Sequence, residues 1–354
     1  MKLTALLGAC MSLVTVHCAY PQSMSHKWVP LGFYGLIKPG SPISQGILEH
    51  QDTVGISLRK SWKQIESGSM KYNWDYFNTE MDKIKNSTSK KKAIARVISG
   101  GINTPNWVMQ QVSKTITYLE TNPYQSTYGT YVTIPVPWDP ALLFYKKHMI
   151  ADFGQAMANH SRMVLIGMSC MNTYSDDWFF PASGEAVQQW IAVGYTPQKL
   201  IDACIEILDA TMAAFPDRSV VWPYGPTTTK LDEDVLSVAR HVISYGNEKY
   251  PGRFYPAKNI LSATTPAVTS NDLGAFAPVH ENAPLSGFQM LWYSSGDETC
   301  RNNGRVTPCD PNEVLRKALE IGADYGVKYI EVYQEDLLDP AMAETIRYGK
   351  SLME

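Results

Sequence analysis

Short β-like runs alternate with longer helical patterns along most of this 354-residue chain. The β-like runs begin at Thr53, Lys91, Thr130, Arg162, Ser219, Asn259, Leu285 and Lys328. The helical patterns span Asp75–Lys85, Pro140–Asn159, Pro197–Phe215, Glu233–Lys249 and Pro311–Tyr325. Such alternation indicates a mostly parallel sheet. Eight strands in about 300 residues favour a (β/α)8 barrel, a single α/β domain with elaborated loops after its strands.

Two observations bear on this fold prediction. No glycine-rich phosphate-binding motif follows any of the runs, which argues against an open nucleotide-binding sheet. The run from Thr130, in "YVTIPVPWDP", is compatible either with a barrel strand or with an extended loop crossing the barrel mouth. The chain also has no linker, low-complexity stretch or internal repeat that would divide it.

The N-terminal stretch "MKLTALLGACMSLVTVHCAY" has one early lysine, an apolar run from Leu3 to about Val16, and then small or polar residues. This pattern predicts a secretory signal peptide over residues 1–19, which leaves 20–354 for the barrel. No later segment is long and apolar enough for a membrane span. We therefore expect a secreted, extracellular or periplasmic protein. Its formal net charge of -3 does not favour a nucleic-acid partner, and the sequence leaves the oligomeric state open.

An oxidising compartment affects how the cysteines are interpreted. Cys300 and Cys309 bracket the polar stretch "CRNNGRVTPC", for which we predict a disulfide, whereas Cys170 and Cys204 are expected to be buried free thiols. The seven histidines are scattered without metal-ligand spacing, so neither a metal nor a cofactor is expected. Asn86-Ser87-Thr88 and Asn159-His160-Ser161 match the acceptor pattern for N-linked glycosylation in a eukaryotic host.

Aromatic, amide and charged residues gather where the predicted strands end. In a parallel barrel these ends form one rim, where reactive and binding groups collect. Aromatic rings there can stack on sugars, and amides or charged groups can bind hydroxyls. The predicted carbohydrate-binding residues are Arg59, Trp62, Trp107, Trp138, Asn172, Trp178, Gln289, Trp292, Tyr293 and Glu335.

Glu331 lies in the middle of the last predicted strand, "KYIEVY". Because side chains alternate along a strand, Ile330 and Val332 suit the layer under the helices, and Glu331 then points into the barrel. A buried carboxylate needs a partner. If the eighth strand closes against the first, Arg59 is the expected partner. The pair could serve catalysis, or it could be a buried ion pair without a catalytic role.

Asp176 and Asp177 follow the fourth predicted strand, in "MNTYSDDW". Glycosidic hydrolysis usually needs two carboxyl groups on either side of the bond. Strands four and eight lie on opposite sides of a barrel, so Asp177 as proton donor could face Glu331 as nucleophile or base, with Asp176 as the substitute donor. Alternatively, Ser175, Asp176 and Asp177 only cap a turn.

The first half of the chain resembles TIM-barrel glycoside hydrolases of the β-galactosidase-like group. The resemblance rests on Arg59 and Trp62, on the run with Glu66, Gly68, Tyr72 and Trp74, and on "TPNWV" from Thr104. It implies a (β/α)8 fold and action on carbohydrates, and it is firm over about 60 residues.

The chain departs from that family at its catalytic positions. Retaining members place an Asn-Glu pair at the end of strand four and a nucleophilic Glu at strand seven. Here Asn172 is followed by Thr173, and strand seven carries Gln289. Either the carboxylates have moved to Glu331 or Glu335 and an Asp, or the strand count is off by one, or the active site has been lost. The sequence thus predicts a glycoside hydrolase-like protein, with a non-catalytic carbohydrate-binding barrel as the alternative and another barrel chemistry as a third class.

Overall fold

The computed structural model describes residues 28–123, 125–295 and 309–354. The predicted signal peptide and Cys300 lie outside these residues. Eight parallel strands form a closed barrel in the order β1-β12-β11-β10-β9-β8-β5-β2. The strands are β1 (Gly32–Leu36), β2 (Thr53–Ser61), β5 (Lys92–Ile98), β8 (Met163–Gly167), β9 (Ser219–Pro223), β10 (Phe254–Leu261), β11 (Gly287–Met290) and β12 (Tyr329–Tyr333). The predicted (β/α)8 fold is therefore confirmed.

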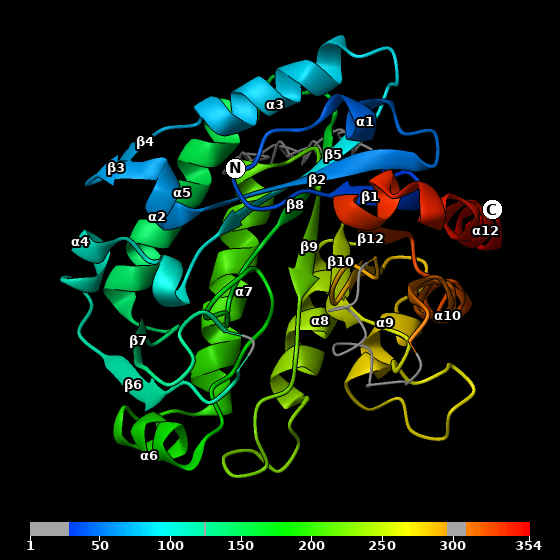
Figure 1. Cartoon of the computed structure of the whole chain (residues 1–354). Helices are drawn as coiled ribbons and strands as arrows, with labels where there is room; N and C mark the ends of the chain where they lie inside the picture. The colour runs from blue at the N-terminus through cyan, green and yellow to red at the C-terminus, as the bar shows by residue number, and fades with distance from the viewer. Residues whose placement is uncertain (1–27, 124, 296–308) are drawn as a thin grey trace, which may run out of the picture.

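The helices lie around the outside of the strands, as Figure 1 shows. They are α1 (Gln45–Glu49), α2 (Trp62–Ile65), α3 (Asp75–Asn86), α4 (Asn106–Met109), α5 (Pro140–Met157), α6 (Gly184–Ala192), α7 (Pro197–Ala214), α8 (Ser237–Lys249), α9 (Ala277–Glu281), α10 (Pro311–Asp324), α11 (Gln334–Leu338) and α12 (Ala343–Met353). The five predicted helices match α3, α5, α7, α8 and α10. Local chemistry explains three of the starts: the side chains of Asp139, Thr196 and Asp310 cap α5, α7 and α10, and each is followed by a proline.

Two of the strand assignments were wrong. The prediction missed β1, whose sequence GFYGL contains two glycines. The run from Thr130 is not a barrel strand, because β7 (Tyr131–Pro135) pairs antiparallel with β6 (Thr115–Leu119) in a separate two-stranded sheet. A second small sheet joins β3 (Glu66–Gly68) to β4 (Lys71–Tyr72). The prediction thus omitted one barrel strand and added one false strand, both before the fourth strand. The numbering from the fourth strand onward is therefore unchanged, and β8 and β12 are the fourth and eighth strands, as expected.

The predicted alternation of side chains is confirmed on the strands that matter for Glu331. Ile56, Leu58, Ile330 and Val332 are fully buried in the large core between strands and helices. A separate apolar cluster fills the inside of the barrel and includes Tyr34, Ile94, Leu165, Val221, Tyr255 and Tyr329. The barrel is therefore a packed interior with a polar layer above its apolar one.

Glycines on the inward face make room for the large interior side chains. A Cβ atom at Gly55 would lie 2.2 Å from the Tyr34 ring, and one at Gly287 would lie 2.2 Å from the Tyr329 ring. At Gly167 it would lie 2.2 Å from Cγ of Arg96. Since protein interiors are close-packed, each of these large side chains fits only because a glycine on the neighbouring strand has no side chain there.

The cysteine prediction was wrong for one pair. Cys170 and Cys204 form a disulfide instead of remaining free thiols, and it ties the segment after β8 to α7. The sequence gave no spacing signal for this bond, because only the fold brings the two residues together. Cys309 is also disulfide-bonded. Its predicted partner, Cys300, lies outside the described residues, so that pairing stays a prediction.

Within the described segments, none of the helices combines the length and apolarity needed to cross a bilayer.

Candidate functional site

Glu331 points into the barrel, as predicted, and is fully buried there. Its two carboxylate oxygens accept hydrogen bonds from Arg96 on β5, from Nη1 at 2.7 Å and from Nη2. Nη1 of Arg96 also donates to the hydroxyl of Ser57 at 2.6 Å. Such bidentate, charge-assisted pairing satisfies both charges away from water.

The predicted Arg59–Glu331 pair is wrong. In the strand register Glu331 aligns with Tyr34 and Tyr34 with Gly55, so Arg59 lies four residues farther along β2, and Arg96 on β5 reaches Glu331 across the barrel interior instead. Arg59 instead donates from Nη1 to Oδ1 of Asp176 at 3.2 Å, and it also donates to the carbonyl of Ile37. Oδ2 of Asp176 lies 3.3 Å from Nε of Arg96. Arg59, Asp176, Arg96 and Glu331 thus form one neutral network, which we call the interior charge layer, and each is at most 5% exposed.

The interior charge layer favours the charged form of Arg96. Although burial opposes its charge, the carboxylates of Glu331 and Asp176 raise the pKa of Arg96 above its usual value. Asp176 reaches this layer from the loop after β8, and the side-chain nitrogen of Asn259 on β10 lies 3.4 Å from its Oδ2. Since Asp176 is buried and both of its oxygens are engaged by guanidinium groups, it has no oxygen free to contact a substrate and does not suit the role of substitute acid.

Asp177 differs from its neighbour. It is half-buried, and its Oδ2 accepts a hydrogen bond from the hydroxyl of Ser175 at 2.7 Å. Burial raises its pKa to about 6, the Asp176 carboxylate adds to the rise, and hydrogen bonds from Ser175 and Asn259 oppose it. The backbone N–H of Asp177 also donates to Ser175 Oγ, so the predicted turn-capping contact is present as well. Asp177 can therefore hold or release a proton near neutral pH. Asp336, after β12, also has a pKa raised to about 6 by burial, but it is fully buried.

The predicted sugar-stacking rings do not form one platform. Trp292 is 37% exposed and lies beside Tyr293 and Tyr333, with ring centroids 5.4 and 6.2 Å away. The other predicted tryptophans are more covered: Trp62 is fully buried, Trp107 packs on Tyr145, Trp138 packs on Trp190 and Tyr195, and Trp178 packs on Trp222. Trp292 is thus the ring best placed to meet a ligand.

The remaining predicted binding residues are held by the protein itself. Asn172 is buried and donates from Nδ2 to the carbonyl of Ser175 at 2.8 Å. Gln289 is buried on β11, in register with Glu331. Glu335 pairs with Lys38 at 2.9 Å at the edge of the mouth. Their roles in binding stay predictions.

Sequence reasoning missed Arg96, Asn259 and Lys258. The signal for Arg96 was present, since Ala95 and Val97 flank it and belong to the outer core, as Ile330 and Val332 do beside Glu331. Lys258 is buried on β10, donates to the carbonyl of Tyr224 at 3.2 Å, and has a pKa lowered to about 8 by burial. Ala257 and Asn259, the residues before and after Lys258 in β10, take the inward positions. The polarity of Lys258 alone therefore did not show which way its side chain points.

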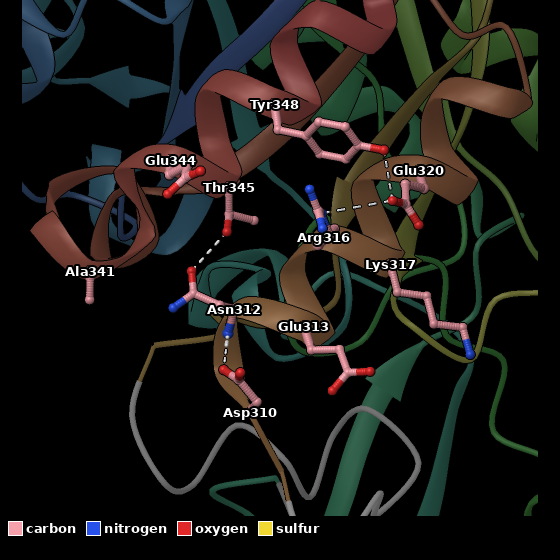
Figure 2. Close-up of a pocket in the computed structure, with 10 residues that line it drawn as sticks. All are labelled: Asp310, Asn312, Glu313, Arg316, Lys317, Glu320, Ala341, Glu344, Thr345 and Tyr348. Carbon is pink, nitrogen blue, oxygen red and sulfur yellow. Dashed lines mark hydrogen bonds and ion pairs between the residues drawn. The ribbon is translucent and has the colours of Figure 1, made fainter.

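Possible metal ligands and a surface groove are the remaining features of the described part of the chain. No group of three His, Cys, Asp or Glu side chains there could hold a metal ion. A groove of about 760 Å³ lies between α10 and α12, outside the barrel (Figure 2). Several of its polar groups are paired with one another: Arg316 lies 4.2 Å from the Tyr348 ring, the Tyr348 hydroxyl donates to Glu320 at 2.9 Å, and Thr345 donates to Asn312 at 2.8 Å. It contains none of the predicted site residues.

Comparison with known proteins places the fold. No protein-family model matches the chain, and no curated protein sequence matches it. Among solved structures, a β-galactosidase from Rahnella sp. R3 superposes with a TM-score of 0.53 at 10% identity, covering 94% of this chain and 57% of that one. Endo-glycoceramidase II from Rhodococcus sp. gives a TM-score of 0.50 at 11% identity, covering 90% and 78%. The predicted resemblance is therefore confirmed at the level of the fold: this chain has the (β/α)8 barrel found in glycoside hydrolases.

Proposed function

We propose that this protein is an exported carbohydrate-binding barrel that does not use Glu331 for hydrolysis. The observation that carries the proposal is the state of Glu331, which is fully buried with both oxygens bound by Arg96. A nucleophile or base must touch the sugar or its attacking water. Glu331 has neither access nor a free oxygen for that contact.

The other positions of a two-carboxylate mechanism support the same conclusion. Asp176 is 2% exposed and engaged by Arg59 and Arg96. Thr173 follows Asn172 at the position where the β-galactosidase-like glycoside hydrolases have their acid/base glutamate, and it is fully buried. Strand seven offers Gln289, an amide that cannot act as an ionised nucleophile. Two other carboxyl groups near the mouth are engaged: fully buried Asp336 accepts hydrogen bonds from the backbone N–H groups of Ser294 and Ser295, and Glu335 pairs with Lys38. Asp177 is thus the better placed proton-exchanging group.

Binding would use the rim near β11 and β12. Trp292 offers an exposed face, and Tyr293 and Tyr333 lie beside it. A ring that stacks on a ligand contributes about 2 kcal/mol when it is a central contact, which corresponds to roughly 30-fold in affinity. Export is supported by the predicted signal peptide and by the disulfides of Cys170–Cys204 and Cys309.

Hydrolysis is a second candidate because Asp177 has the properties of a general acid. Its pKa of about 6 keeps part of the population protonated near neutral pH, and its Oδ1 has no hydrogen-bond partner. An inverting reaction would then need a second carboxylate about 6.5–9.5 Å away on the opposite face of the sugar.

A combined binding and turnover assay separates the two candidates. A panel of aryl glycosides and polysaccharides is offered to the wild type and to Trp292→Ala, Asp177→Asn and Glu331→Gln. We expect binding without hydrolysis, and a roughly 30-fold loss of affinity in Trp292→Ala. Trp28→Ala is the matched control, because Trp28 is 68% exposed but precedes β1 at the opposite end of the barrel.

The outcomes differ clearly. Turnover that disappears in Asp177→Asn but survives in Glu331→Gln would establish hydrolysis with Asp177 as the acid. Turnover that disappears in a folded Glu331→Gln would reinstate Glu331 as a catalytic residue and refute the proposal. Equal affinity losses in Trp292→Ala and Trp28→Ala would place the binding surface elsewhere.

A further inference from the structure

Two glycosylation tripeptides occur in the sequence, Asn86-Ser87-Thr88 and Asn159-His160-Ser161. In both, the asparagine and the hydroxyl residue two positions later are exposed. Asn86 is the last residue of α3, and Asn159 follows the end of α5 by two residues. Asn86 is thus at the exposed C-terminal end of its helix and Asn159 is outside one, so a bulky substituent can be accommodated at both.

The two tripeptides lie next to each other in the fold. Each stands in the connection that leads from a helix into a barrel strand, and the strands concerned, β5 and β8, are neighbours. His160, inside the second tripeptide, contacts Oδ1 of Asn78 on α3 at 3.0 Å through Nε2. Arg162 donates from Nη1 to the carbonyl of Lys90 at 3.1 Å, which joins the two connections directly.

This location is at the closed end of the barrel. Connections that enter the N-terminal ends of strands lie opposite the rim at which functional groups collect in (β/α)8 proteins. Trp292 and Asp177 follow the C-terminal ends of β11 and β8, at the other end. Substituents on Asn86 and Asn159 would thus project away from the proposed binding surface.

The compartment needed for this modification agrees with other features. The disulfide between Cys170 and Cys204, together with the disulfide of Cys309, fits an oxidising environment. The N-terminal sequence predicts entry into the secretory pathway. Oxidising conditions and N-linked glycosylation coincide in the eukaryotic secretory pathway.

We propose that Asn86 and Asn159 each carry an N-linked oligosaccharide, so that the closed end of the barrel is glycosylated and the mouth is not. In the transfer, the side-chain amide nitrogen forms a bond to C1 of a lipid-linked oligosaccharide. The bond from C1 to the lipid pyrophosphate breaks, the pyrophosphate leaves, and the amide nitrogen loses one proton. The hydroxyl groups of Thr88 and Ser161 complete the recognised tripeptides. This inference is independent of whether the mouth binds carbohydrate.

The test is translation of the full chain with and without endoplasmic-reticulum microsomes, followed by electrophoresis before and after an amidase that removes N-glycans. We expect two discrete mobility steps in the wild type, one step in Asn86→Gln and in Asn159→Gln, and none in the double variant. Thr88→Ala and Ser161→Ala should each remove the same step while leaving the asparagine in place. Asn247→Gln, at an exposed asparagine outside such a tripeptide, should leave both steps.

Other outcomes would count against the proposal. A chain that enters the microsomes, and is protected there from added protease, yet keeps its original mobility refutes glycosylation at both sites. A chain that stays outside the microsomes refutes the export on which the inference depends. A step that survives Thr88→Ala or Ser161→Ala would assign the modification to another site.

Discussion

Replacing Glu331 by glutamine should destabilise the protein severely, because it leaves Arg96 charged and incompletely paired inside the barrel. The two side chains are at most 1% exposed, and both oxygens of Glu331 are engaged. Removing one partner of a buried ion pair costs about 3–5 kcal/mol. With a urea dependence of about 3 kcal/mol per molar, the unfolding midpoint should fall by about 1–1.7 M.

A double-mutant cycle measures the interaction between Arg96 and Glu331 separately from the contribution of each side chain alone. Arg96→Met combined with Glu331→Leu removes both charges and substitutes apolar volume, so we expect the double variant to be more stable than either single variant. Glu335→Gln is the control, since the Lys38–Glu335 pair is partly exposed, with side-chain exposures of 63% and 23%. That variant should lose about 0–1 kcal/mol.

Urea unfolding followed by near-ultraviolet circular dichroism measures the stability of Glu331→Gln, Glu335→Gln, Arg96→Met, Glu331→Leu and the double variant. A Glu331→Gln protein that unfolds at the same urea concentration as Glu335→Gln would refute the structural role assigned to Glu331. Additive losses from Arg96→Met and Glu331→Leu would show that the two side chains do not act as a pair.

Three further predictions concern neighbouring features. Asp177 should titrate with a midpoint near pH 6 by carboxyl NMR. Because its pKa is raised in the folded state, its contribution to stability falls as pH rises from about 4 to about 6. Asp177→Asn should remove that pH dependence from the urea midpoints measured across this range. Gly167→Ala should lower the urea midpoint by an amount equivalent to about 1–3 kcal/mol, because its Cβ would lie 2.2 Å from Arg96, whereas Gly184→Ala, with nothing within 4 Å, should be close to neutral. Replacing Cys170 and Cys204 by serine opens a loop with a sequence separation of 34 and should cost about 3–4 kcal/mol, measured as a lower urea midpoint under non-reducing conditions. A reductant should lower the wild-type midpoint at least as far, because it also opens the disulfide of Cys309.

The barrel could be predicted from the sequence because its signals are local. Helix starts such as Asp139-Pro140 and Thr196-Pro197 combine a capping side chain with a proline. Seven of the predicted strand runs coincide with or overlap barrel strands, since buried β-branched and aromatic residues mark them. The exception, β1, has Gly32 and Gly35 among its five residues, and glycine-rich sequence resembles a loop.

The partners inside the barrel could be predicted only in part. Alternation along a single strand showed that Glu331 faces inward, but its partner depends on which strands are adjacent and on how far a side chain reaches. Arg96 binds Glu331 although β5 lies one strand farther from β12 than β2 does, because its side chain reaches across the barrel interior. The Cys170–Cys204 bond was missed for a similar reason. It joins a segment after a strand to a helix, and the spacing of the two cysteines in the sequence does not indicate that they meet.

The pairing of Arg96 with Glu331 also has a consequence for how the chain folds. These residues are 235 positions apart, so until β12, near the C-terminus, closes the barrel, the guanidinium groups of Arg59 and Arg96 have only the single carboxylate of Asp176 between them. A partly folded chain that buried β5 without β12 would hold an unneutralised cation in a low-dielectric interior. Open half-barrels are thereby penalised, which favours folding as one cooperative unit and makes the last strand the step that completes the molecule.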